Sequence, residues 1–184
     1  MIVIEGMESG GRIGNLTTMA LMTNVLPEVG LPVVVAGGIA DGRGLAAALI
    51  MGACGVQIGS RFLLSEECES HPSNAQAIIN ATDTDSITTG WSRGMGMRGL
   101  RSAFSDKYLE MEVSGAPLAR LNEFATGCSR KVAEEGVGPD GMNGIVQCGE
   151  GLVPLRRIQP AAEIIREVIE EAESLLKTAP ELVK

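Results

Sequence analysis

Three glycine-containing turns follow closely after short apolar runs, and their placement suggests a site for an anion. The turns are Ser9-Gly10-Gly11, Ala36-Gly37-Gly38 and Gly59-Ser60. Glycine lets the backbone approach a ligand closely, so its N–H groups can bind an anion such as phosphate. A single Gly-Gly pair usually makes only a tight turn. Three such turns at one edge of a sheet favour phosphate binding.

The elements around these turns alternate as strand, glycine turn and helix, which is typical of parallel βα units. The expected strands cover residues 1–4, 33–36 and 55–58. The expected helices run from Thr17 or Thr18 to Val29, and over 42–51 with Asp41 as N-cap. The first strand is a continuous apolar run, which predicts burial on both faces. The turns would then meet at the carboxyl ends of the strands, where parallel barrels bind ligands, assisted by the N-terminal dipoles of the following helices.

The alternation stops after Phe62. We expect a helix over 73–81, a short strand over 86–89, a glycine-rich stretch over 90–99, helical pieces over 103–113 and 117–127, and a loop over 136–151. The last helix is the clearest, because its apolar residues recur at helical spacing and form one stripe. They are Ala161, Ile164, Ile165, Val168, Ile169, Ala172, Leu175 and Leu176. The chain thus divides into a βα segment (1–82), a mostly helical cap (83–158) and a docked C-terminal helix (159–184).

Composition narrows the function classes. The 184 residues are 45% hydrophobic but only 3% aromatic, so the core must be largely aliphatic. A net charge of −8 argues against nucleic acid as a partner. The four cysteines are far apart and the chain has one histidine, a pattern that predicts reduced, mostly buried thiols and no metal or disulfide framework. No apolar run reaches membrane-spanning length, so we expect a soluble, cytoplasmic protein without membrane contact.

Three motifs carry a resemblance to a known family. They are Glu5-Gly6-Met7-Glu8-Ser9-Gly10-Gly11, Pro32-Val33-Val34-Val35-Ala36-Gly37-Gly38-Ile39-Ala40-Asp41-Gly42 and Gly55-Val56-Gln57-Ile58-Gly59-Ser60-Arg61-Phe62. Their order and spacing resemble the nitronate monooxygenase family, which includes 2-nitropropane dioxygenase-type enzymes and FMN-dependent enoyl-acyl-carrier-protein reductases. The first motif is closer to the reductases. The rest of the chain matches only loosely, including residues 96–103 and 141–152.

The resemblance implies an α/β fold, a TIM-type barrel of which this chain holds the last three βα units, strands six to eight. It implies FMN as cofactor, bound by Ser9, Gly10, Gly11, Ala36, Gly37, Gly38, Gln57, Gly59 and Ser60. It also implies one of two reactions on a small-molecule substrate. A nitronate is oxidised with O₂, or an enoyl thioester is reduced with NAD(P)H, in which case acyl carrier protein is a partner.

Two departures from the family pattern keep other interpretations open. The family has a catalytic histidine directly after Gly-Gly, whereas this chain has Arg12, which cannot act as a base but could hold an anionic substrate. The first five strands of the family's barrel are absent. Because an open sheet exposes the inward faces of Val3, Val34 and Val56, we expect an N-terminal half-chain as partner, or self-association. The alternative is a catalytically inactive remnant that binds phosphate or a partner chain.

Weaker candidates remain. Gly94-x-Gly96-x-x-Gly99 matches the dinucleotide fingerprint formally, but it follows only a marginal strand, and no clear strand with a terminal acid comes after it. A basic patch for an acidic carrier protein would use Arg93, Arg98 and Arg101, although a solvated loop is the simpler interpretation. A pocket for an apolar substrate would use Met95, Met97, Met142 and Ile145, and plain core packing is the alternative. His71 is expected at the surface, and Glu5 could orient Arg12.

Overall fold

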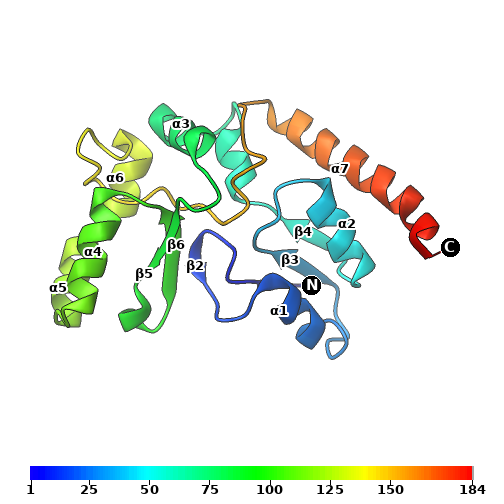
Figure 1. Cartoon of the computed structure of the whole chain (residues 1–184), viewed down its shortest axis with the longest axis horizontal. Coiled ribbons are helices and arrows are strands. Elements are labelled where there is room, and N and C mark those ends of the chain that lie inside the picture. The colour runs from blue at the N-terminus through cyan, green and yellow to red at the C-terminus, as the bar shows by residue number, and fades with distance from the viewer. Residues whose placement is uncertain (184) are drawn as a thin grey trace.

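The computed structural model describes residues 1–183. Its first part is a three-stranded parallel sheet with helices between the strands (Figure 1). The elements are β1 (Ile2–Glu5), α1 (Thr18–Val25), β3 (Val33–Ala36), α2 (Gly42–Ile50) and β4 (Gly55–Gln57). The strand order is β1-β3-β4, with Val3 opposite Val34 and Val34 opposite Gly55. The expected parallel pairing is therefore confirmed.

The two faces of this sheet differ. Ile2, Ile4, Val33, Val35 and Val56 point to one face, where they pack with Met22 from α1 and Ala48 from α2. The opposite face carries Val3, whose exposed fraction is 49%. Burial of β1 on both faces was thus a wrong expectation, because α1 and α2 pack on only one of them. Val56 was also misplaced, since Gly55, not Val56, shares the face of Val3 and Val34.

Residues next to the helix ends explain where α1 ends and where α2 begins. α1 ends at Val25, four residues before the expected Val29, because Pro27 cannot donate a helical hydrogen bond. Thr17 is the N-cap residue, but its side chain makes no capping hydrogen bond. Asp41 caps α2 as expected, and its Oδ1 accepts from the backbone N–H groups of Arg43 (3.0 Å) and Gly44 (3.3 Å).

The second part contains an antiparallel sheet of which the sequence predicted only the strand over 86–89. β2 (Gly11–Ile13), β6 (Gly96–Leu100) and β5 (Ser86–Thr89) form an antiparallel sheet in the order β2-β6-β5. Helices α4 (Ala103–Val113), α5 (Leu118–Ala125) and α6 (Cys128–Glu135) lie beside it, with the short helix η2 (Trp91–Arg93) between β5 and β6 (Figure 1). The cap is therefore not only helical, and β2, in the expected first segment, pairs with the second.

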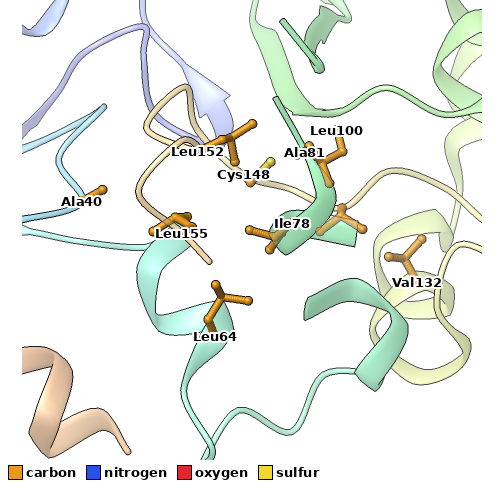
Figure 2. Close-up of a cluster of buried hydrophobic side chains, with 10 residues drawn as sticks. Ala40, Leu64, Ile78, Ala81, Leu100, Val132, Cys148, Leu152 and Leu155 are labelled. Atoms are coloured by element: carbon orange, nitrogen blue, oxygen red, sulfur yellow. The ribbon is translucent and has the colours of Figure 1, made fainter. Parts of the chain in front are cut away.

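A shared core connects the two parts. Leu64 ends the 3₁₀ helix η1 (Ser60–Leu64), Ile78 lies in α3 (Pro72–Asn80), and Leu155 comes from the long loop that follows α6. All three are fully buried and gather in one cluster with Leu100, Val132, Cys148 and Leu152 (Figure 2). Since this cluster draws on residues before and after position 82, both segments depend on the same core.

The C-terminal helix α7 (Ala161–Thr178) packs along α2 and leads into η3 (Ala179–Val183) (Figure 1). Only part of its expected stripe is covered. Ile164, Val168 and Ala172 are buried, whereas Ile165, Ile169 and Leu175 are exposed. α7 therefore keeps an apolar face that nothing among the described residues covers.

Candidate functional site

A pocket of about 240 Å³ lies at the carboxyl ends of the three parallel strands. Glu5, Ala36 and Gln57 are the last residues of β1, β3 and β4, are in register, and point to the same face of the sheet. All three line the pocket. Parallel pairing therefore places the three turns around one space.

Eight of the nine residues expected at the cofactor line this pocket. They are Ser9, Gly10, Ala36, Gly37, Gly38, Gln57, Gly59 and Ser60. Gly11 does not line it, because Gly11 already begins β2 and pairs with Arg98. The three turns are thus brought together, while the chain leaves the pocket at Gly11.

The fold requires glycine at two of these turns but not at Gly59. Gly37 and Gly38 have φ angles of 114° and 68°, which L side chains rarely adopt. A Cβ on Gly10 would lie 2.5 Å from the carbonyl carbon of Cys148. Gly59 has φ of −103°, and a Cβ there would meet no atom within 4 Å. A side chain at Gly59 would therefore occupy open space where the residue lines the pocket.

The polar lining of the pocket combines neutral hydrogen-bond donors with one carboxylate, that of Glu5. Ser9 lines the pocket and is 6% exposed, and its Oγ has no hydrogen-bond partner within the described chain. No Lys or Arg of residues 1–183 lines the pocket. Arg61, next to Ser60, is buried and donates instead to the carbonyl of Arg157 (3.3 Å) and to Gln159. An anion here would be held by hydroxyl and backbone N–H donors.

The expected contribution of the α2 dipole is not available. Gly42 N–H donates to Glu171 Oε2 at 2.7 Å, and the next two amides donate to Asp41. Burial raises the pKa of Asp41, but hydrogen bonds from Arg43 and Gly44 outweigh that effect, so its pKa lies below the usual value. Two carboxylates therefore already occupy the start of α2.

One wall of the pocket was not predicted from the sequence. Gln147, Gly149 and Gly151 line it from the long loop before α7. Gly149 N–H donates to Ser60 Oγ at 2.8 Å, and Glu150 N–H donates to Glu8 O at 2.9 Å. The spacing of Gly149 and Gly151 was the only local signal. Between Gln147 and Gly149 the loop buries Cys148, and that burial raises the pKa of the thiol to about 12.

Arg98 connects the cap sheet to the pocket loops, so at this residue the expectation of a solvated loop was wrong. Its guanidinium is 8% exposed and donates to Met7 O (3.1 Å) and Ser86 Oγ (3.1 Å), and it pairs with Glu150 at 2.6 Å. Arg101 pairs with Asp106 at the surface.

The fingerprint residues Gly96 and Gly99 lie inside β6, not at a turn that opens a helix. A Cβ on Gly99 would contact Ile145 and the Val146 carbonyl. These glycines therefore allow close packing in an antiparallel sheet and do not form a dinucleotide loop.

The other singled-out residues lie apart from the pocket. Arg12 is exposed in the middle of β2, opposite Met97, and makes no hydrogen bond to Glu5 among the described residues. Met95 and Met142 are exposed, whereas Ile145 is buried beside a second pocket that neither methionine lines. His71 is half-buried and caps α3, where its Nδ1 lies 2.8 Å from Ser73 Oγ.

The cysteines are free thiols, and only Cys148 is buried, so the expectation of mostly buried thiols was wrong. Among residues 1–183, no three His, Cys, Asp or Glu side chains are grouped as metal ligands. No helix in that range combines the length and apolar character needed to cross a bilayer.

Comparison with known proteins identifies the family of this chain. A family model described as nitronate monooxygenase matches residues 1–171. The chain belongs to the nitronate monooxygenase family. Members of this family are flavin-dependent oxidoreductases. A probable nitronate monooxygenase of Staphylococcus haemolyticus is 32% identical over 74% of this chain and 41% of its own length. Nitronate monooxygenase npaC of Metarhizium robertsii is 33% identical over 96% of this chain and 53% of its own.

Solved structures agree with this assignment. FabK from Thermotoga maritima superposes with a TM-score of 0.91 and 37% identity over 98% of this chain and 56% of that one. Nitroalkane oxidase from Streptomyces ansochromogenes shares the fold, with a TM-score of 0.77 and 23% identity. The chain thus has the α/β fold of these enzymes and spans about half the length of the relatives it matches.

Proposed function

We propose that this chain contains the part of an FMN site that binds the phosphate group, in an oxidoreductase of the nitronate monooxygenase family. The observation that carries the proposal is the unpartnered, buried Ser9 hydroxyl on a pocket whose other walls are the glycine turns of β3 and β4. Such an arrangement at the carboxyl ends of parallel strands is typical of phosphate sites in barrels.

The residues present fit the phosphate of FMN. Ser9, Ser60 and the backbone of Gly37, Gly38 and Gly59 would hold it with neutral donors. When bound, the flavin ring supplies the hydride and electron transfer that amino acid side chains cannot. The chain's own residues would fix the ring's position by anchoring the phosphate, with Gln57 and Gln147 offering amides within the same pocket.

The reaction is one of two, the oxidation of a nitronate with O₂ or the reduction of an enoyl thioester with NAD(P)H. In both routes a substrate oxygen carries negative charge, in the nitronate itself or in the enolate that forms on reduction. Arg12 is our candidate for holding that charge, because its guanidinium is always protonated and its side chain is free at the surface of β2. The first motif and the 37% identity to FabK favour the reductase route, in which acyl carrier protein would be a partner.

Titration of the purified chain with FMN tests the proposal directly. We expect quenching of FMN fluorescence and a visible spectrum characteristic of a bound flavin. Turnover assays with a nitronate, and with an enoyl thioester plus NADH, then distinguish the two reactions. A folded chain that does not bind FMN even with the N-terminal half supplied would contradict the cofactor assignment. Binding of FMN without either turnover would favour the inactive-remnant alternative.

We further propose that the chain supplies the last three βα units of a TIM-type barrel and associates with a chain that supplies the others. β1 and β4 are both edge strands, and unpaired strand edges pair readily with further strands. Beside β4 lies an apolar groove of about 270 Å³ lined by Leu45, Val56, Ile58, Phe62, Ile165, Val168 and Ile169. This groove would receive a partner's helix packed outside the new strand.

Size-exclusion chromatography with light scattering, with and without a coexpressed N-terminal half, tests this association. We expect a one-to-one complex, or self-association of the chain by itself. The matched variant is Ile165→Asp in the groove, with Ile158→Asp as an exposed apolar control outside it. A monodisperse monomer that ignores the N-terminal half would refute the association.

A further inference from the structure

Thr18 lies behind the Gly37-Gly38 turn, on the side away from the FMN pocket. It is the first residue of α1 and is 8% exposed. Its Oγ1 lies 2.9 Å from Glu8 Oε2 and 3.1 Å from Gly37 O, so one hydroxyl proton is shared between two acceptors. Glu8 Oε2 also accepts from the Thr18 backbone N–H at 2.8 Å. Glu8 thus holds Thr18 in place over the Gly37 carbonyl.

The packing leaves Thr18 little freedom. A Cβ on Gly37 would lie 2.6 Å from Thr18 Oγ1, and a Cβ on Gly6 would contact the same oxygen. The hydroxyl therefore fits only because both neighbouring positions are glycine. Neither Glu8 nor Thr18 lines the FMN pocket; they line a separate hollow that shares Gly37 and Gly38 with it.

The hydrogen bond between Thr18 and the Gly37 carbonyl affects the direction of the Gly38 N–H, because one peptide bond joins the two groups. In a trans peptide, the carbonyl of Gly37 and the N–H of Gly38 point in opposite directions. A hydrogen bond that draws the Gly37 carbonyl toward Thr18 therefore directs the Gly38 N–H away from Thr18, toward the phosphate side. Both residues have positive φ and carry no side chain, so no side chain of their own fixes the orientation of this peptide.

We infer that Thr18, held by Glu8, is a positioning residue that sets the Gly37-Gly38 peptide for a phosphate and so makes the site prefer FMN to riboflavin. The inference rests on the proposed FMN site. Riboflavin shares the ring system and lacks the phosphate. A change in riboflavin affinity therefore measures effects of Thr18 that do not depend on phosphate binding.

The test measures FMN and riboflavin affinities of the full chain by fluorescence titration for wild type, Thr18→Val, Thr18→Ala and Thr18→Ser. Thr18→Val removes the hydroxyl at nearly constant volume, and Thr18→Ala does so without added bulk beside Gly37. Thr18→Ser keeps the hydroxyl. We expect roughly tenfold weaker FMN binding in Thr18→Val and Thr18→Ala, the loss of about one hydrogen bond. Riboflavin affinity should be unchanged in all four proteins, and Thr18→Ser should bind FMN like wild type.

Circular dichroism melting confirms that each variant is folded. Unchanged FMN affinity in both hydroxyl-free variants would overturn the inference, as would an equal loss for FMN and riboflavin, or a Thr18→Ser variant as weak as Thr18→Ala. If both hydroxyl-free variants fail to fold while Thr18→Ser folds, Thr18 is needed for the fold and the positioning role is overturned. A folded wild type that binds no FMN even with the N-terminal half supplied would instead refute the proposed function, and the inference with it.

Discussion

Replacing Gly59 by valine should weaken FMN binding strongly while leaving the fold intact. The structure makes this position unusually clean, because Gly59 has negative φ and a Cβ there would meet no protein atom within 4 Å. The valine side chain would instead stand in the pocket and separate the phosphate from the backbone donors of Gly59 and Ser60. Hydrogen bonds to charged groups contribute about 1.5–3 kcal/mol each. Losing one or two of them corresponds to ~2–4 kcal/mol, or roughly 30- to 1,000-fold in the dissociation constant.

Isothermal titration calorimetry with FMN measures this loss, and chemical denaturation measures the free energy of unfolding. The matched control is Gly30→Val, where a Cβ also meets nothing within 4 Å but the residue lies far from the pocket lining. Both variants should change the unfolding free energy by less than about 0.5 kcal/mol. FMN affinity that is unchanged in Gly59→Val would show that the phosphate does not bind at this turn.

Three further outcomes are expected. Arg12→His should restore a base and raise activity on neutral nitroalkanes, by up to about 10²–10⁴-fold, more than on preformed nitronates; an equal response on both substrates would remove position 12 from proton transfer. Leu155→Ala in the shared core should lower the free energy of unfolding by ~2–5 kcal/mol in denaturant titrations, and a cost below 1 kcal/mol would show that the two parts do not depend on this core. The pKa of Asp41 is lowered in the folded chain, so its ionised carboxylate stabilises the fold above the unfolded-state pKa near 4. This stabilisation is lost as the pH falls through the folded-state pKa. Asp41→Asn should therefore reduce the loss of thermal stability between about pH 5 and 3, and an identical pH profile would contradict that role.

Sequence reasoning succeeded where the signal was local. Short apolar runs bounded by glycine predicted the parallel strands, and Asp41 before a helical stretch predicted its cap, because both depend on residues adjacent in the chain. The glycine turns met in one pocket because parallel pairing in register brings the strand ends together. Seven of the eight cofactor residues that line this pocket belong to those turns, whereas Gln57 was expected only from the family resemblance.

What sequence reasoning missed depends on distant contacts. β6 contains Gly96 and Gly99, which have low strand propensity. Only close packing explains them, against Thr88, Trp91 and Ile13 at Gly96 and against Ile145 and Val146 at Gly99. The pocket wall at Gly149 is held by Ser60, which is 89 residues away. Arg98 looked solvated because nothing nearby in sequence predicts its bonds to Met7 and Glu150.

The route of the chain between β1 and α1 has a thermodynamic consequence. This one connection places Ser9 in the pocket and, two residues later, enters β2, which is hydrogen-bonded into the cap sheet (Figure 1). The cap therefore cannot separate without disturbing the Ser9 side of the pocket. A ligand that binds only the docked arrangement stabilises both parts together through linkage. Saturation with such a ligand should make the cap and the parallel sheet unfold as one cooperative unit, with slow hydrogen exchange in β6 as well as in β3.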